Sequence, residues 1–513
     1  MKTWLLLFII AGLTVVVWHK TLSQTFMGEG YYYLDIKQHF ISTEYGVNLE
    51  NLHMADNFAR LMFDLLFPVV RDNFFIYQAF QLITLIALNV TLFYLTVFFS
   101  KNKTIGFITT LLFLASYTGL FEMVGIGNYQ RFAQRVPNLI PTLLAFIFLA
   151  RYLQDRKVKY YLFSISLFAL GIFMGHFSSF LLPLFVIYPL IWTSMQKHKV
   201  KALFHSLLIS STFFIVNVLL TLQDHLRPTR NVIEFIYSTG IPTLAEQMVL
   251  QLGNMLLPPT LIKTVASIAQ PYTDTIIILS LPIVAIYVLG VIVVKKSSPR
   301  ALAIYITSLL LIPILLFLNL YLGKVDPGYN MQGYKYYFMH VYLAQKTGIT
   351  EDVRGDRYYF LPFLFITILS AILLWNITKP NKSHFGKLAL ILVVGSYVVY
   401  NTSLVWRSLE KLQPLSRVTR NYLDHIHSLS DNFSNDTIIA TQQSLSWPDP
   451  MIRALYKYPD MQFVLFRPGW EDELQHNNRN NIFVIDYDYE LNQIIDLTQR
   501  YRNGEQNLLP KSY

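Results

Sequence analysis

Long apolar stretches recur along most of this chain, and they constrain its fold more than any other feature. Each is close to the roughly 17 to 25 residues that a helix needs to cross a bilayer. Charged residues make up only 14% of the chain, against about 25% in ordinary soluble domains. The sequence therefore predicts a polytopic α-helical membrane protein with about eleven transmembrane helices, at residues 3–19, 75–99, 104–125, 137–152, 160–176, 178–194, 202–222, 274–294, 301–322, 358–376 and 388–406.

The formal net charge of +10 is unevenly distributed along the chain. Basic residues gather in the short loops that follow every second span, where the only acid is Asp155. Because Lys and Arg in short loops stay on the cytoplasmic side, we expect a cytoplasmic N-terminus and large outer loops at 20–74, 223–273 and 323–357. The basic excess thus reflects membrane topology, and no nucleic-acid partner is predicted.

The last hundred residues differ in character from the spans. Residues 407–513 are polar and contain short β-type runs at 437–440, 462–466 and 481–485, which alternate with helical patterns at 450–456 and 490–501. Such alternation predicts a small α/β domain, which the topology places outside the membrane. The chain has no cysteine, and this excludes disulfides, thiol catalysis and cysteine-ligated metal.

The first outer loop carries the most informative motif, in the segment from Met27 to Phe40. Two carboxylates, Glu29 and Asp35, lie six residues apart, soon after the first span, among tyrosines that include Tyr31 and Tyr32. Carboxylates can act as general bases, and tyrosine rings can stack on sugars. Irregular backbone cannot face lipid at membrane depth, so a long outer loop is where such an enzyme can place its chemistry.

Over about residues 1–406 the chain resembles the GT-C superfamily of polytopic glycosyltransferases, in particular its dolichyl-phosphate-mannose and aminoarabinose transferase-like members. Glu29-Gly30-Tyr31-Tyr32 is similar to the later part of the acidic first-loop motif of that superfamily, often Asp-Glu-Ala-Tyr-Tyr. Gly28 stands where the family usually has Asp. The resemblance therefore implies that either Glu29 or Asp35 supplies the catalytic carboxylate.

The third outer loop ends in a segment that resembles the Arg-Tyr-x-x-Pro motif of the family, with one additional residue before Pro362. The resemblance implies that Arg357, and with it Arg354, binds the phosphate of a lipid-linked donor. The planar guanidinium of arginine suits that role. The alternative is that Arg357 is an interfacial anchor beside two tyrosines.

Three further charged residues and one histidine are candidates for the same site. Glu122 lies near the outer end of the third span, with Arg131 and Arg135 just beyond it. Ionisable residues within a span are functional candidates by default, although an ion pair at the interface would explain this group equally well. His176 closes a glycine-containing helix end, at a place where the family has a similar pattern.

Taken together, these residues predict a hexosyl- or pentosyltransferase of the cell envelope that moves a sugar from a polyprenyl-phosphate donor to a lipid, glycan or protein acceptor, with inversion. No cofactor is predicted with certainty, and a divalent cation remains compatible with the loop carboxylates. The alternative function is a transporter or flippase of a lipid-linked glycan. It is disfavoured because the charged groups gather at one membrane face and no internal repeat is present.

Overall fold

The structure of the protein is a computed structural model. It describes residues 2–513 except for 26–40, 43–45, 48–56, 118–128, 197–198, 222–231, 259–260, 262–263, 265–267, 269–271, 322–359, 381–382, 443–447, 459, 467–468, 475, 489–490, 492, 506–507 and 509–513.

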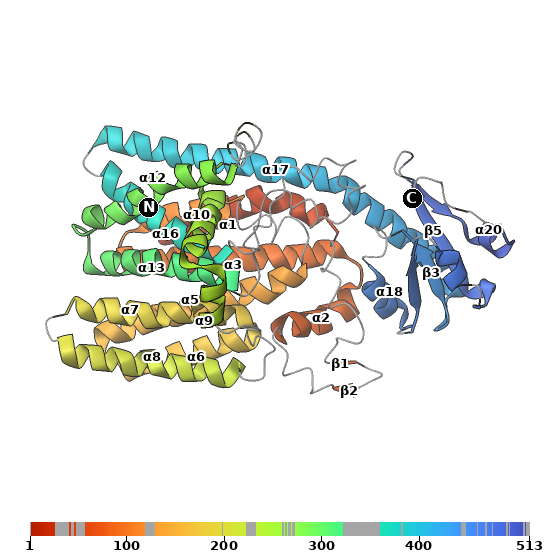
Figure 1. Ribbon diagram of the computed structural model, residues 1–513, viewed down its shortest axis with the longest axis horizontal. Coiled ribbons are helices and arrows are strands. Elements are labelled where there is room, and N and C mark those ends of the chain that lie inside the picture. Colours follow the sequence, from red (N-terminus) through yellow and green to blue (C-terminus); the bar gives the residue numbers. More distant parts are fainter. Residues whose placement is uncertain are drawn as a thin grey trace.

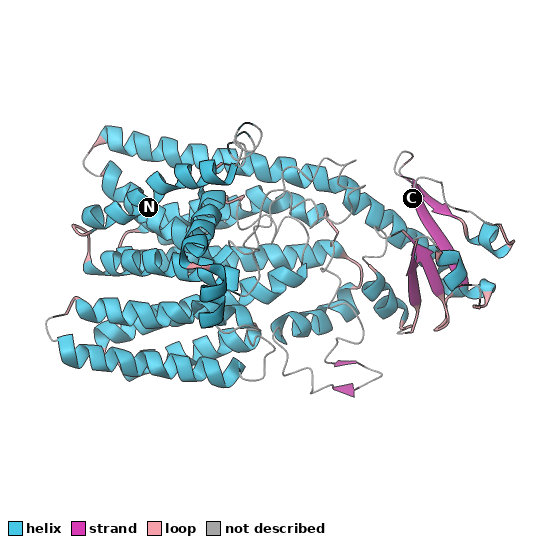
Figure 2. Cartoon of the chain, in the orientation of Figure 1, coloured by secondary structure: helices cyan, strands magenta, loops and turns pink. Residues whose placement is uncertain are grey.

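A bundle of long helices forms most of the molecule, and a small sheet lies beyond one end of it (Figures 1 and 2). The bundle helices are α1 (Thr3–Trp18), α3 (Phe74–Ser100), α4 (Lys103–Leu114), α5 (Tyr129–Asp155), α6 (Val158–Met174), α7 (Leu182–Ser194), α8 (Lys199–Thr221), α12 (Tyr272–Val294), α13 (Pro299–Tyr321), α16 (Phe360–Thr378) and α17 (His384–Leu429). We call the end of the bundle nearer the sheet the sheet end. The opposite end carries the basic loops after α3, α5 and α12, and we call it the basic end.

The predicted spans are helical over most of the residues that the structure describes in them. Nine helices of the described chain are long and apolar enough to cross a membrane, and α4 and α6 are shorter apolar helices. The predicted span at 104–125 is the least complete, because α4 ends at Leu114 and residues 118–125 lie outside the described part. The protein is a multi-pass helical membrane protein.

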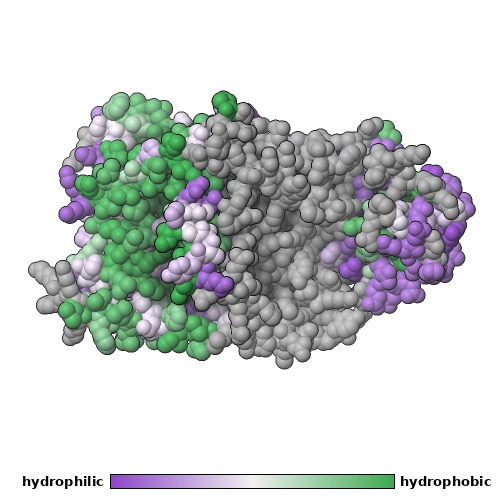
Figure 3. Space-filling view, in the orientation of Figure 1, coloured by the Kyte–Doolittle hydropathy of each residue, from purple (hydrophilic) through white to green (hydrophobic). Residues whose placement is uncertain are grey.

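Side chains from many helices form one apolar core in the bundle, and aromatic rings are prominent near its basic end. Phe99 of α3 stacks on Phe146 of α5 with ring centroids 5.2 Å apart, and Tyr188 of α7 contacts both rings edge-on. The span helices are apolar around most of their circumference, so they bury one side in this core and expose the other to lipid. Figure 3 shows the resulting apolar surface around the bundle.

The pair of predicted spans around His176 is two separate helices. α6 ends at Met174, the 3₁₀ helix η6 (His176–Leu181) follows, and α7 continues from Leu182. The side chain of Asn138 on α5 donates a hydrogen bond of 2.9 Å to the carbonyl oxygen of Gly175. This bond gives a partner to a backbone carbonyl group that has no intrahelical hydrogen bond at the helix break.

α17 is much longer than the predicted span at 388–406, since it continues to Leu429. Beyond the apolar segment its buried residues recur every three or four positions, at Leu409, Leu412, Ser416, Thr419, Tyr422 and Ile426. That spacing is typical of an amphipathic helix. The change of composition near residue 406 is therefore a change of environment along one helix, and α17 runs from the bundle to the sheet (Figure 1).

The C-terminal region contains a four-stranded sheet with the order β4-β3-β5-β6. The strands are β3 (Ile438–Thr441), β4 (Gln462–Leu465), β5 (Ile482–Asp488) and β6 (Gln493–Asp496). β3 is parallel to both β4 and β5, whereas β6 is antiparallel to β5. Helices α18 (Asp449–Tyr456) and α19 (Trp470–Glu473) lie in the connections, so the region is a small α/β unit as predicted.

The helical pattern predicted at residues 490–501 was wrong for its first half. Residues Gln493–Asp496 form strand β6, and only the short helix α20 (Thr498–Arg502) follows. Ile494 and Ile495 pair with Tyr487 and Asp486 of β5. β-branched residues pack well on a sheet edge, and this tertiary contact outweighed the weak helical periodicity.

The sheet is packed between two apolar clusters, one on each face. On one face Ile439, Phe483 and Ile485 join α17 and the adjoining helices α2 (Asn57–Val70) and α3. On the other face Ile438 and Val484 join α19 and α20. Because the first cluster includes residues of the bundle helices, it fixes the sheet to the bundle.

Other elements lie in the predicted outer loops. The first loop contains α2 and a short antiparallel pair, β1 (Ile41–Ser42) and β2 (Gly46–Val47). The second contains α9 (Val232–Thr239) and α10 (Ile241–Leu256), which lie across the bundle helices in Figure 1. The remaining 3₁₀ helices are η1 (His19–Ser23), η9 (Ser430–Asn432) and η11 (Arg479–Asn481).

Candidate functional site

Most of the predicted site residues lie outside the described part of the chain. These are Glu29, Tyr31, Tyr32, Asp35, Glu122, Arg354 and Arg357. Their assignments remain predictions. Arg131 and His176 are placed by their backbones only, Arg131 in the first turn of α5 and His176 at the start of η6, while Arg135 is described completely.

The described residues that flank the segments carrying these predicted residues meet at the sheet end of the bundle. Phe360 follows the segment with Arg357, and its ring lies 6.4 Å from that of Phe177 and 5.8 Å from that of Phe113. Tyr117 precedes the segment with Glu122, and its backbone N–H donates a hydrogen bond of 3.4 Å to the side-chain oxygen of Asn401. The loop carrying Arg357 and the segment carrying Glu122 thus start or end at the same part of the bundle.

The first outer loop also starts there, and α17 holds its beginning in place. The side chain of Gln24 donates a hydrogen bond to the carbonyl oxygen of Leu409, and the backbone N–H of Thr25 donates one to the Ser416 hydroxyl. Both Gln24 and Thr25 are fully buried. The loop with Glu29 and Asp35 therefore begins from a fixed position at the sheet end.

Arg135 is the buried cation of this region. Its side chain is 7% exposed, and its guanidinium carbon lies 5.2 Å from the centroid of the Phe177 ring. It lies at the sheet end of α5, where the apolar span begins. A cation–π contact offsets part of the cost of burying this charge, and a buried guanidinium at the end of a span is suited to holding an anion.

Two buried glutamines, which the sequence analysis did not select, lie near the sheet end of α3. Gln78 and Gln81 are 0% and 1% exposed, and within the described residues neither side-chain amide has a hydrogen-bond partner. They continue the helix face that carries Leu85 and Leu88 in the bundle core. Buried amides are normally hydrogen-bonded. The pair could have been found from the sequence, because it consists of two glutamines three residues apart in an apolar span.

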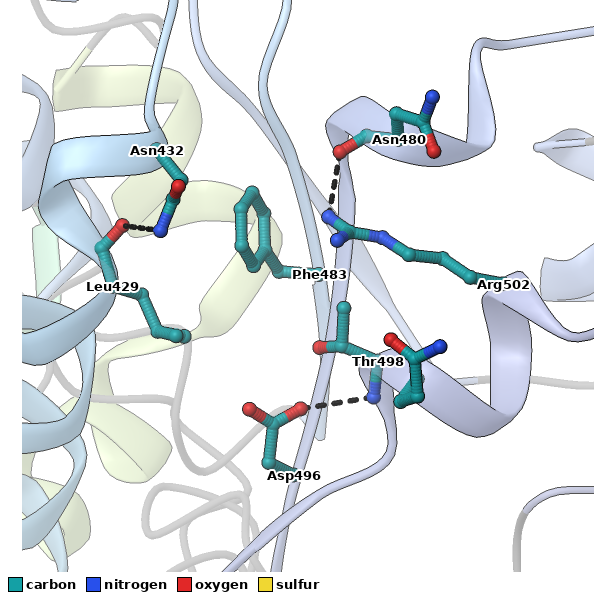
Figure 4. A pocket seen from close by; sticks show the side chains of 8 residues that line it. Leu429, Asn432, Asn480, Phe483, Asp496, Thr498 and Arg502 are labelled. Atoms are coloured by element: carbon teal, nitrogen blue, oxygen red, sulfur yellow. Dashed lines mark hydrogen bonds between the residues drawn. The ribbon is translucent and has the colours of Figure 1, made fainter.

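A separate pocket of about 560 Å³ lies between the end of α17 and the sheet (Figure 4). Its charged groups are engaged within the protein. The Arg502 guanidinium donates to the carbonyl oxygen of Asn480 and lies 5.0 Å from the Phe483 ring centroid. Asp496 accepts the Thr498 backbone N–H at 2.9 Å and lies 3.2 Å from the His425 ring nitrogen. These contacts support the packing of the domain on α17, and we assign no chemistry to the pocket.

The pKa of Asp496 predicts how the stability of this packing depends on pH. Burial acts to raise its pKa, but hydrogen bonds from His425 and Thr498 outweigh it, so the pKa is lowered. A lowered pKa stabilises the fold above the unfolded value of about 3.9, and this contribution is lost as the pH falls through the folded pKa. We expect Asp496→Ala to destabilise β6 by about 1 kcal/mol at pH 6, with the difference from wild type fading as the pH falls from the unfolded value through the lowered pKa of Asp496.

Hydrogen exchange of the β5 and β6 amides in the full chain would measure this effect at each pH. Asp460→Ala is the matched control, because Asp460 is an exposed acid of the same domain. Equal exchange in Asp496→Ala and wild type at pH 6 would show that the contacts of Asp496 contribute nothing measurable to stability.

Metal binding was left open by the sequence. Within the described residues, no three or more His, Asp or Glu side chains are grouped so that they could hold a metal ion. Glu29, Asp35 and Glu122 lie outside those residues.

Comparison with protein-family models and with curated protein sequences returns no match. Among solved structures, the chain is similar to the oligosaccharyltransferase AglB of Archaeoglobus fulgidus in complex with an inhibitory peptide and a dolichol-phosphate, with 13% identity over 95% of this chain and 69% of that chain and a TM-score of 0.45. It is also similar to a complex of the Archaeoglobus fulgidus oligosaccharyltransferase with Zn and sulfate, with 12% identity over 94% and 68% of the two chains and a TM-score of 0.45. For ArnT from Cupriavidus metallidurans in the apo state the values are 11% identity, 94% and 93% coverage, and a TM-score of 0.41.

Proposed function

We propose that this protein is a GT-C-type glycosyltransferase that moves a sugar from a polyprenyl-phosphate donor to an acceptor on the outer face of the membrane. The observation that carries the proposal is the position of Arg135. Its guanidinium is buried against Phe177, which also contacts Phe360. A positive charge is thus held at membrane depth, where the segments with the candidate carboxylates and with Arg357 begin or end.

This arrangement suits a lipid-linked sugar phosphate. The donor lipid would lie along the apolar surface of the bundle, and its phosphate would reach Arg135 and Arg357 at the sheet end. A guanidinium forms charge-assisted hydrogen bonds to phosphate oxygens and stabilises the charge on the departing phosphate. The amides of Gln78 and Gln81 both donate and accept hydrogen bonds, which matches the hydroxyl groups of a sugar.

In this mechanism a loop carboxylate removes the proton from an acceptor hydroxyl as the oxygen attacks the anomeric carbon. The bond from that carbon to the phosphate oxygen breaks, and the phosphate leaves with the bonding electron pair. Glu29 is the first choice for the base, and Asp35 is the alternative. Attack opposite to the leaving phosphate inverts the anomeric centre.

The proposal is tested by a transfer assay in proteoliposomes with a panel of radiolabelled polyprenyl-phosphate sugars. We expect one donor to lose its label to an acceptor, and the product to have the inverted configuration. The flippase alternative predicts a different result, because the labelled lipid would change leaflets with its glycosidic bond intact. Donor movement without bond cleavage for every sugar would contradict the transferase proposal.

The orientation can be tested separately, because the chain has no native cysteine. We expect Asn435→Cys, beside the sheet, to react with a membrane-impermeant maleimide on intact cells. We expect Lys296→Cys, at the basic end between α12 and α13, to react only after the membrane is opened. Both positions are exposed, so a difference in labelling reports sidedness. The reverse pattern would invert the proposed topology.

A further inference from the structure

Two arginines share one aromatic ring at the basic end of the bundle. The guanidinium carbons of Arg151 and Arg300 lie 5.7 Å and 5.5 Å from the centroid of Phe98. Arg151 is in the last turns of α5, Arg300 is in the first turn of α13, and Phe98 is near the end of α3. The fold thus brings together two cations that are far apart in the sequence.

Within the described part of the chain, no acidic side chain neutralises these two cations. Across the described residues, neither guanidinium has a carboxylate within ion-pair distance. The start of α13 adds the partial positive charge of a helix N-terminus. The positive-inside rule explains why basic residues occur at this end, but it does not explain why two of them are held against the same ring. Because both guanidinium carbons lie within 5.7 Å of one ring centroid, an anion beside this ring is attracted by two positive charges.

Two buried hydrogen-bond donors lie in the ring cluster that adjoins Phe98. Phe99, adjacent to Phe98, contacts Tyr188, and Tyr188 stacks on Trp192 with centroids 6.3 Å apart. The Tyr188 hydroxyl and the Trp192 indole N–H are buried and have no hydrogen-bond partner in the described part of the chain. The two cations favour an anion beside Phe98, and the two buried donors lie in the adjoining ring cluster.

The surroundings of Arg151 indicate that the anion is a lipid headgroup. Arg151 is exposed and also lies 5.9 Å from the Phe148 ring centroid. The Phe148 ring lies 5.6 Å from that of Phe163, which is 55% exposed beside Leu162 at 59%. This apolar surface runs from the arginine toward the middle of the bilayer, where an acyl chain would lie. A soluble phosphate ion would gain nothing from it.

We propose that Arg151 and Arg300 bind the phosphate of an anionic phospholipid in the leaflet at the basic end, with an acyl chain on Phe148 and Phe163. The site is independent of the proposed transferase activity. It lies at the opposite end of the bundle from Arg135, and its occupant is a structural or regulatory lipid.

The test uses the full-length protein, exchanged from detergent into equal parts of phosphatidylcholine and phosphatidylglycerol and analysed for retained lipid by native mass spectrometry. A basic residue near the membrane surface raises affinity for anionic lipid about fivefold. We therefore expect Arg151→Gln/Arg300→Gln to bind phosphatidylglycerol roughly thirtyfold more weakly than wild type. Thermal unfolding in phosphatidylcholine alone shows whether this variant remains folded.

Two further variants separate a specific site from general surface charge. Lys295→Gln/Lys296→Gln removes the same charge from two exposed lysines at the same end, and we expect it to retain phosphatidylglycerol. Arg151→Lys/Arg300→Lys keeps the charge but loses the planar fork, so we expect intermediate retention and a folded protein. Equal losses in the arginine-to-glutamine and lysine-to-glutamine pairs would overturn the proposal. Displacement of the lipid by millimolar inorganic phosphate would also overturn it, because the site would then be a free-phosphate site.

Discussion

Glu29→Gln should remove most transfer activity while leaving the protein folded and able to bind its donor. A general base contributes about 10² to 10⁴-fold in rate, and the amide keeps the size of the side chain without its basicity. We expect kcat to fall by that factor in the proteoliposome assay, with little change in donor binding. Asp35→Asn should cost less, because Asp35 does not align with an acid of the family motif.

The pair of variants decides between the two carboxylates. If Asp35→Asn abolishes transfer and Glu29→Gln does not, Asp35 is the base and the motif alignment is misleading. If both variants turn over normally, the proposed mechanism is wrong. Gly28, which occupies the usual position of the family Asp, cannot take part in proton transfer.

Arg135→Ala should weaken donor use by about tenfold to a hundredfold, which corresponds to a lost hydrogen bond to a charged group. The guanidinium is held by Phe177 at membrane depth, so no neighbouring solvent can replace it. Arg135→Lys should restore part of the loss, because it keeps the charge without the bidentate geometry. Donor titrations of kcat and KM would measure both variants.

The matched control is Lys157→Ala, which removes an exposed cation just beyond the basic end of the same helix. We expect it to transfer sugar like wild type. A purely structural role for Arg135 makes a different prediction. Arg135→Ala would then lower the melting temperature but leave the donor affinity of the folded molecules unchanged. Arg135→Lys would in that case show no specific recovery of donor affinity.

The bundle could be predicted from the sequence because lipid permits few backbone structures. A chain segment that crosses lipid must satisfy its own backbone hydrogen bonds, so a long apolar run becomes a helix whatever its neighbours are. The parallel strands near Ile439 and Val484 were also predictable, since buried strands have a clear apolar pattern. The extent of α17 was not predictable, because residues beyond 406 continue the helix only by packing Leu409, Tyr422 and Ile426 against other elements.

The sequence by itself determined the membrane class, the position of the spans and the first-loop motif, because local composition and spacing control these features. Only the tertiary structure decided which distant residues meet. Phe177 and Phe360 are far apart in the chain, yet their ring centroids lie 6.4 Å apart, and Phe177 also contacts Arg135. Arg151 and Arg300 likewise meet only because α5 and α13 both pack near Phe98. Apolar spans resemble one another in sequence, so the choice of neighbours depends on side-chain packing across the whole bundle.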